Sequence, residues 1–226
     1  MKILALDTSS PYLSIAIFDK DQLLVTRRLK NRKTLSQSLM GWITTTLEKS
    51  ELKLKDLDGF IVGLGPGYFT SLRVGLSSVK GMAFALEKPV AGISSLDLIT
   101  EGLKKIEHDV CVITDAKRNL LYTAYYQCKN GVLKKIGKDR LLSIEIICAE
   151  LKGKVLFAGD GIPLAKDVIV KHKSIDPVFA DEKYWYPQAK YSFERGTEAL
   201  KKCKEGDNGM CVVPEYLYTQ DCQVQK

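Results

Sequence analysis

Two short turns in this sequence place a carboxylate beside hydroxyl or amine side chains, directly after an apolar segment. Asp7, Thr8 and Ser9 follow the first such segment, and Asp115-Ala-Lys117 follows a second one. Paired carboxylates with neighbouring hydroxyls could hold the magnesium ion and the phosphates of a nucleotide. Asp and Ser also close strand-ending turns by hydrogen-bonding the backbone. We favour this second interpretation, because further ligands are hard to find in the sequence.

The other residue types that carry out catalysis do not form a set. The loop Gly63-Leu-Gly-Pro-Gly67 lacks the lysine and the spacing of a phosphate-binding P-loop, and no Gly-x-Ser-x-Gly nucleophile motif is present. His108 and His172 have no metal-ligand spacing, and Cys111 lies inside an apolar segment, where a thiol is inert. The sequence therefore predicts no catalytic site, no metal site and no intrinsic cofactor.

A basic run lies between the third predicted strand and the first predicted helix. It consists of Arg27, Arg28, Lys30, Arg32 and Lys33. The formal net charge of +7 also favours polyanionic partners, RNA included. RNA phosphates would suit the run, and an edge strand kept soluble by charge would explain it equally well. No RNA-binding motif with stacking aromatics accompanies it, so sequence-specific RNA recognition by this chain alone is not expected.

A long helix is predicted over residues 71–86, with Thr70 or Ser71 as its N-cap. One face has the apolar spacing expected for the core of its own domain: Leu72, Leu76, Val79, Ala83 and Leu86. A second stripe at the same spacing consists of small residues: Val74, Ser78, Gly81 and Ala85. Small side chains let another helix approach closely, so we predict that this stripe contacts a partner.

A second amphipathic helix is predicted from the spacing of apolar residues over 35–47, with Trp42 on a different side. Four residues of this helix are assigned to the same partner interface: Leu39, Met40, Ile43 and Leu47. Two neighbouring helices with surplus apolar surface would form a helix bundle with a partner.

The chain contains an internal repeat. Its first half is predicted to contain strands at 2–7, 12–18, 22–29, 59–62 and 90–93, with the two helices between them. Residues 110–115 match 2–7 with an offset of 108, and with this offset the hairpin turn Asp19-Lys-Asp21 meets Gln127-Cys-Lys129. Further elements are predicted at 143–151 (helix), 155–158 (strand), after Pro163 (helix), 188–203 (helix) and 211–213 (strand).

A doubled meander followed by alternating helices and strands predicts a duplicated α/β fold. The expected architecture is the actin-like, ribonuclease-H-like fold of the ASKHA superfamily, with mixed sheets flanked by helices. We place the N-terminal subdomain, with the partner-binding helices, at 1–103 and the C-terminal subdomain at 104–226. The last long helix could pack across both subdomains.

Length and composition describe an ordinary globular protein. The chain has 226 residues, of which 45% are hydrophobic and 27% charged, enough for one large or two modest domains. Six cysteines without a Cys-x-x-Cys pair are expected to be reduced thiols. The apolar segment before Asp7 is too short for the core of a signal peptide, and no apolar run reaches membrane-spanning length. A cytoplasmic protein without membrane contact is expected.

Several collinear motifs resemble one known family. They are Lys2-Ile-Leu-Ala-Leu-Asp-Thr-Ser9, Gly65-Pro-Gly-Tyr-Phe-Thr-Ser-Leu-Arg73, Lys80-Gly-Met-Ala83, Gly92-Ile-Ser-Ser-Leu96, Asp115-Ala-Lys117, Gly159-Asp-Gly161 and Pro214-Glu-Tyr-Leu217. Together they resemble the TsaB family, formerly YeaZ, over most of the chain, and the Gly-Pro-Gly-x-Phe-Thr-x-Leu-Arg signature is the specific one.

The resemblance implies an actin-like protein with two subdomains that serves the threonylcarbamoyl modification of the adenosine beside the anticodon of tRNA. It implies a non-catalytic scaffold that activates a TsaD-like partner through the two N-terminal helices, in an assembly that also recruits a TsaE-like ATPase. It further implies contact with tRNA through the complex, a homodimer when the chain is alone, and ATP or ADP with magnesium in the complex.

The sequence departs from the family pattern in three places, which bear on the contacts of individual residues with a partner or a nucleotide. The first predicted helix begins with Lys33-Thr-Leu-Ser-Gln37 where a His-centred start is usual, and Tyr68 and Ser71 stand where serine and glycine are usual. The end reads Tyr216-Leu-Tyr218 where an arginine commonly follows. The alternative to the scaffold is an enzyme, either a nucleotide-binding or nucleotide-hydrolysing actin-like protein or a metalloprotease-like protein.

Overall fold

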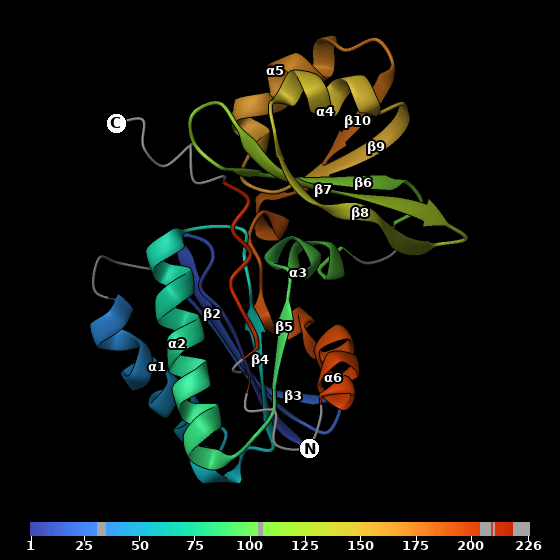
Figure 1. The fold of residues 1–226 in the computed structure, drawn as a ribbon. Helices are drawn as coiled ribbons and strands as arrows, with labels where there is room; N and C mark the ends of the chain where they lie inside the picture. The colour runs from blue at the N-terminus through green and yellow to red at the C-terminus, as the bar shows by residue number, and fades with distance from the viewer. Residues whose placement is uncertain (31–34, 104–105, 204–208, 210, 219–226) are drawn as a thin grey trace. The chain divides into compact units, whose positions relative to one another are not determined.

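The computed structural model describes residues 1–30, 35–103, 106–203, 209 and 211–218. The chain divides into two compact units. The first unit contains residues 1–98 and 187–215, and the second contains 99–186 and 216–226. Each unit has its own five-stranded sheet with helices packed on it (Figure 1).

The sheet of the first unit has the order β3-β2-β1-β4-β5. Its strands are β1 (Lys2–Asp7), β2 (Tyr12–Asp19), β3 (Gln22–Lys30), β4 (Gly59–Gly63) and β5 (Val90–Ile93). β1, β2 and β3 form an antiparallel meander, whereas β4 is parallel to both β1 and β5. Alternate residues of β1 enter two different cores, Leu4 on one face and Ile3 on the other, because side chains alternate across a strand.

Helices cover both faces of this first sheet. α1 (Leu35–Lys49) and α2 (Phe69–Leu86) lie side by side on one face, and α6 (Phe193–Lys202) lies on the other (Figure 1). The shorter elements of the unit are η1 (Leu54–Asp56), η3 (Ala189–Tyr191) and α3 (Ser95–Glu101), whose last residues belong to the second unit. The α6 backbone packs directly on the sheet, since a Cβ added at Gly196 would overlap the Ile61 side chain.

The second unit repeats the strand order of the first. Its sheet has the order β8-β7-β6-β9-β10, the counterpart of β3-β2-β1-β4-β5. The strands are β6 (Asp109–Asp115), β7 (Leu121–Lys129), β8 (Val132–Leu142), β9 (Gly153–Ala158) and β10 (Ile175–Phe179). α4 (Ile144–Glu150) and α5 (Ile162–Lys171) pack on one face, and η2 (Glu182–Tyr184) follows β10. The predicted duplicated fold of two mixed sheets flanked by helices is confirmed.

Several local predictions differ from the structure. α2 begins at Phe69 after Tyr68, whose side chain makes no capping hydrogen bond, so the predicted N-caps Thr70 and Ser71 were wrong. The second hairpin turns at Asn130-Gly131, because β7 continues through the predicted turn at Gln127–Lys129. Residues 211–213 form no strand, whereas the sequence analysis overlooked β10.

The two units also differ from the predicted subdomains. The division falls between residues 98 and 99, not between 103 and 104. Residues 187–215, α6 included, belong to the first unit, although the sequence analysis assigned them to the second. The reason lies in the core, since Ala189 and Leu200 are buried among the apolar residues of β1, β2, β4 and β5.

Candidate functional site

The first candidate site is the turn that follows β1. The Asp7 carboxylate is fully buried. Its Oδ1 accepts hydrogen bonds from the Ser9 backbone N–H at 2.9 Å and the Ser9 hydroxyl at 2.8 Å, and its Oδ2 accepts one from the Ser95 hydroxyl at 2.6 Å. Burial raises the pKa of Asp7 above its ordinary value, although these hydrogen bonds oppose the shift. The carboxylate therefore closes the turn from inside the unit.

The surroundings of this turn are filled by backbone. A Cβ at Gly63 would overlap the Asp7 carboxylate, and one at Gly67 would overlap the Ser9 carbonyl. The Thr8 hydroxyl donates to the Ser71 carbonyl at 2.8 Å, and Gly75 packs against the Thr8 side chain. Asp7 is therefore enclosed by neighbouring backbone and hydroxyl groups, and it presents no exposed oxygen at this turn.

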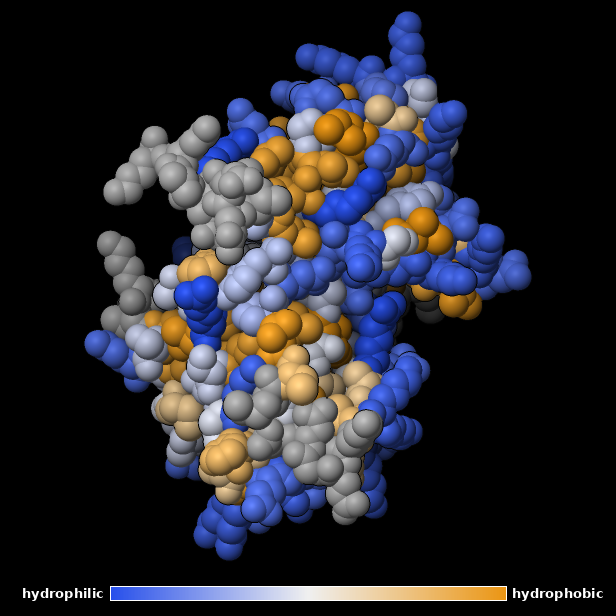
Figure 2. Space-filling model, in the orientation of Figure 1, coloured by the Kyte–Doolittle hydropathy of each residue, from blue (hydrophilic) through white to orange (hydrophobic). Residues whose placement is uncertain are grey.

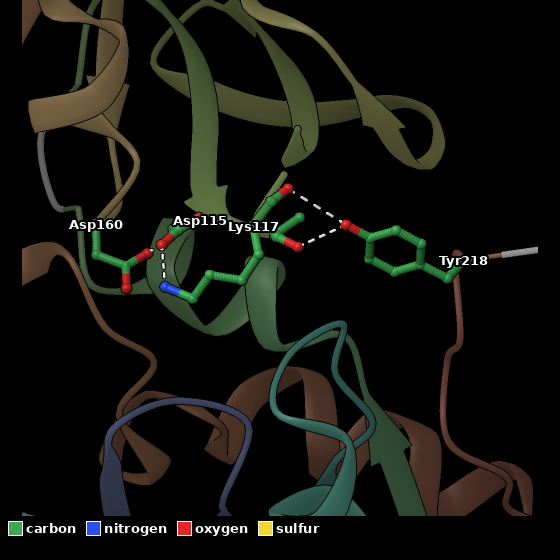
Figure 3. A network of polar contacts seen from close by, with 5 residues as sticks. Asp115, Lys117, Asp160 and Tyr218 are labelled. Carbon is green, nitrogen blue, oxygen red and sulfur yellow. Dashed lines mark hydrogen bonds and ion pairs between the residues drawn. The ribbon is translucent and has the colours of Figure 1, made fainter. Parts of the chain in front are cut away.

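The turn after β6 is the counterpart of this turn in the second unit (Figure 3). Asp115 is ion-paired with the Lys117 ammonium, and its Oδ1 accepts a hydrogen bond from the Lys117 backbone N–H at 2.7 Å. The Asp115 backbone N–H donates to Asp160 Oδ1 at 3.1 Å. Asp160, from the Gly159-Asp-Gly161 motif, has a pKa raised chiefly by burial. Asp115 was predicted as a candidate ligand from its turn, whereas its partner Asp160 was not.

Tyr218 supports the same turn from the C-terminal segment. Its hydroxyl donates to the Ala116 carbonyl at 2.6 Å and lies 3.3 Å from the Lys117 carbonyl (Figure 3). Its ring meets the Tyr122 ring edge-on, with centroids 6.1 Å apart. Burial raises the pKa of Tyr122 to about 12. No sequence pattern indicated this role beyond an aromatic residue near the C-terminus.

The second candidate site is the pair of helices α1 and α2. Three of the four α1 residues assigned to the interface, Leu39, Ile43 and Leu47, are buried in the core of the first unit. They face the sheet, so they are not available to a partner on the surface. Met40 is exposed, and so are its neighbours Gly41 and Trp42, which the sequence analysis did not assign to the interface.

The small-residue stripe of α2 reaches the surface in its second half. Gly81 and Ala85 are exposed, whereas Val74 and Ser78 are partly buried. A Cβ built on Gly81 would meet no atom of the described residues within 4 Å, so this part of the helix is open there. The neighbouring Phe84 is 65% exposed, and Figure 2 shows hydrophobic side chains at the surface over α2. Phe84 belongs to neither predicted stripe and was missed.

The basic run lies partly on the edge strand β3. The Arg27 guanidinium stacks on the Trp42 ring, with its Cζ 4.6 Å from the ring centroid. The same guanidinium donates a hydrogen bond from Nη1 to the Thr45 hydroxyl at 2.8 Å. The Arg28 guanidinium stacks on the Tyr12 ring, with its Cζ 4.0 Å from the ring centroid. The remaining members of the predicted RNA patch, Arg32 and Lys33, lie outside the described residues.

The described residues bear on three further possibilities: a metal site, a reactive thiol and a membrane-spanning helix. There, no group of three or more His, Cys, Asp and Glu side chains could hold a metal ion. Burial raises the pKa of the Cys111 thiol to about 12, which makes it a poor nucleophile. No helix in the described part of the chain is long and apolar enough to cross a membrane.

The repeated strand order and the flanking helices define an actin-like α/β protein. A family model described as "TsaD: tRNA N6-adenosine threonylcarbamoyltransferase" matches residues 30–221. The chain is 28% identical to the tRNA threonylcarbamoyladenosine biosynthesis protein TsaB of Bacillus subtilis, over 100% of this chain and 97% of that protein. It is 29% identical to the Escherichia coli protein of the same name, over 71% of this chain and 72% of that protein.

Solved structures agree on the fold. A Pseudomonas aeruginosa protein described as similar to peptidase YEAZ superposes with a TM-score of 0.80 at 24% identity, over 96% of this chain and 99% of that one. Because the family model matches residues 30–221, the chain belongs to the family that this model describes. Its relatives place it with the TsaB, or YeaZ, proteins.

Proposed function

We propose that this chain is a non-catalytic scaffold that binds and activates a TsaD-like protein in the threonylcarbamoylation of tRNA, at the adenosine beside the anticodon. The names of the matched relatives place those proteins in the biosynthesis of threonylcarbamoyladenosine in tRNA. The observation that carries the proposal is the open stripe at Gly81 and Ala85 on α2, with the exposed Met40 on the neighbouring α1.

This surface suits a helical partner. A stripe without bulky side chains lets a second helix approach closely. Phe84 supplies exposed apolar area next to Ala85 on α2, and Met40 supplies exposed apolar area on α1. In the absence of the TsaD-like partner, a second copy of this chain would use the same surface to form a homodimer. In the complex, a TsaE-like ATPase and the tRNA substrate would join the pair of subunits.

The closed turn at Asp7 supports the non-catalytic part of the proposal. Its carboxylate is committed to Ser9 and Ser95, and the backbone of Gly63 lies directly against it. A magnesium nucleotide requires exposed oxygen ligands, which Asp7 does not offer.

The interface is tested by adding bulk to the open stripe. Gly81→Leu and Ala85→Arg should leave the chain folded, because both positions are exposed and Gly81 has open space beside it. We expect each variant to weaken binding to a co-expressed TsaD-like protein by about tenfold or more, measured by co-purification and analytical sizing. Val132→Arg, at a 67% exposed position on β8, serves as the control and should bind normally. Normal co-elution of both α2 variants would exclude this surface.

The enzyme alternative is tested separately. Titration of the isolated protein with ATP and magnesium in a calorimeter should show no tight binding. Tight binding that Asp7→Ala abolishes would favour a nucleotide-hydrolysing enzyme over the scaffold.

A further inference from the structure

The duplication allows the two strand-ending turns to be compared directly. In the first unit, the turn after β1 is packed shut around Asp7. In the second unit, the equivalent turn after β6 borders a pocket of about 530 Å³, which we call the second-unit pocket. It is lined by Asp115, Lys117, Arg118, Asn119, Leu120, Leu121, Ser143, Ile144, Glu145, Leu164, Ala165 and Val168. A cavity of this size accommodates a small molecule.

One wall of the second-unit pocket is apolar. It is formed by Leu164 and Val168 on successive turns of α5, with Ile144 of α4 nearby. Leu164 is 64% exposed and Val168 is 36% exposed, although α5 packs on the sheet through other residues. Exposed aliphatic side chains that line a cavity are the usual apolar contacts of a bound ligand.

The lining of the pocket also carries charges of both signs. Lys117 and Arg118 supply two cations, and Asp115 and Glu145 supply two carboxylates. A hydrogen bond from the Ser143 hydroxyl lowers the pKa of Glu145, which keeps that carboxylate charged. The formal charge of the lining is therefore balanced.

The turn that presents these charges is held in a demanding conformation. Lys117, Arg118 and Asn119 are three consecutive residues with positive φ, at 68°, 54° and 58°. Such backbone persists only where surrounding contacts fix it. Here the Leu120 backbone N–H donates to the Lys117 carbonyl at 3.0 Å, and the Asp115 and Tyr218 contacts brace the turn (Figure 3). The charged groups are thus attached to a preorganised loop.

We propose that the second-unit pocket binds a zwitterionic small molecule with an apolar side chain, of which an apolar α-amino acid is the simplest case. The ligand carboxylate would face Lys117 and Arg118, its ammonium would face Asp115 and Glu145, and its side chain would lie on Leu164 and Val168. A phosphate ester would be repelled by the two carboxylates, and a simple cation by the two basic groups. This inference is independent of the proposed scaffold function.

The ligand chemistry is tested with the full-length protein and L-leucine as the probe. We expect saturable binding by calorimetry, with chemical-shift changes in ¹H–¹⁵N spectra that centre on residues 115–120, 143–145 and 164–168. N-acetyl-L-leucine lacks the ammonium and L-leucinamide lacks the carboxylate, so each should bind about tenfold or more weakly. AMP that bound more tightly than every apolar L-amino acid tested would overturn the zwitterion assignment.

The location is tested with a matched pair of substitutions on α5. Leu164→Glu places a third carboxylate in the pocket and should reduce leucine affinity by about tenfold or more. Val170→Glu makes the same change at a 58% exposed position that does not line the pocket, and it should leave affinity unchanged. Equal losses in both variants, unchanged binding in Leu164→Glu, or no saturable binding of leucine, isoleucine, methionine or phenylalanine would overturn the proposal.

Discussion

At the scale of single residues, two aspartates at equivalent strand ends have opposite surroundings. Asp7 is fully buried and accepts three hydrogen bonds from Ser9 and Ser95. The side chain of Asp115 is 20% exposed and ion-paired with Lys117. The same residue type therefore closes one turn and presents charge at the other.

The buried carboxylate of Asp7 predicts a measurable pH dependence of stability. Its native pKa lies above the ordinary value of 3.8, so above that pH the unfolded chain releases the proton more readily than the native chain. The wild-type free energy of unfolding should therefore fall as the pH rises from 3.8 toward the native pKa. The amide side chain of the Asp7→Asn variant does not titrate, and its oxygen can still accept the hydrogen bonds that Ser9 donates.

Urea denaturation at a series of pH values checks this prediction. The difference in the free energy of unfolding, Asp7→Asn minus wild type, should increase as the pH is raised above 3.8. The same comparison at an exposed carboxylate, Glu51→Gln, serves as the control for general charge effects. A difference for Asp7→Asn that stays constant from about pH 3 to about pH 7 would contradict the assignment of a raised pKa.

At the scale of elements, α2 contains two glycines with opposite roles. A Cβ at Gly75 would overlap the Thr8 side chain, so this glycine allows the helix to approach the β1 turn. Within the described part of the unit, no atom lies within 4 Å of a Cβ added at Gly81, so none of those residues requires a glycine there. A glycine that weakens a helix without an internal reason is consistent with use of the surface by a partner.

These two glycines predict stability changes of opposite sign. Gly75→Ala should lower the free energy of unfolding by about 1–3 kcal/mol, because the new methyl group must displace Thr8. Gly81→Ala should raise it by about 0.5–1 kcal/mol, because alanine favours the helix. Urea denaturation of both variants measures the effects. Changes of the same sign would show that the packing around one of the two glycines is not as described.

The elements also show what the sequence could predict. Most strands and the duplicated fold followed from apolar periodicity and from the repeat, because both depend on patterns that local sequence carries. β10 was overlooked because Pro177 interrupts it, yet an edge strand tolerates proline. The hairpin turn at Asn130-Gly131 carried a strong sequence signal, with positive φ at both residues, but a constant repeat offset placed it too early.

The candidate sites were predicted less well than the fold. Helical spacing shows that Leu39 and Ile43 share a face but cannot show whether a sheet or a partner covers it. The contact of Tyr218 with the turn at Ala116 joins residues about a hundred positions apart, and no local pattern reports such a pairing. The open stripe at Gly81 was found because small residues at helical spacing are themselves a sequence pattern.

At the scale of the whole molecule, the chain passes between the two units three times, after residues 98, 186 and 215. The segment 187–215 returns to complete the first unit. There the Phe193 ring packs on Phe18 with centroids 5.1 Å apart, and the Ala189 backbone N–H donates to the Ser14 hydroxyl at 2.8 Å. One face of the first sheet is therefore covered by residues remote in sequence.

This arrangement predicts that the N-terminal stretch does not fold alone. A fragment of residues 1–103 would expose the face of the sheet that carries Ile3, Phe18 and Ile61. We expect it to aggregate and to bind a hydrophobic dye, because an apolar sheet face without a cover is unstable in water. Addition of a peptide of residues 187–215 should restore a monomeric fold, measured by circular dichroism and sizing. The same peptide with Gly196→Val should fail, because the new side chain would collide with Ile61. A well-folded monomeric 1–103 fragment without the peptide would show that the returning segment is dispensable.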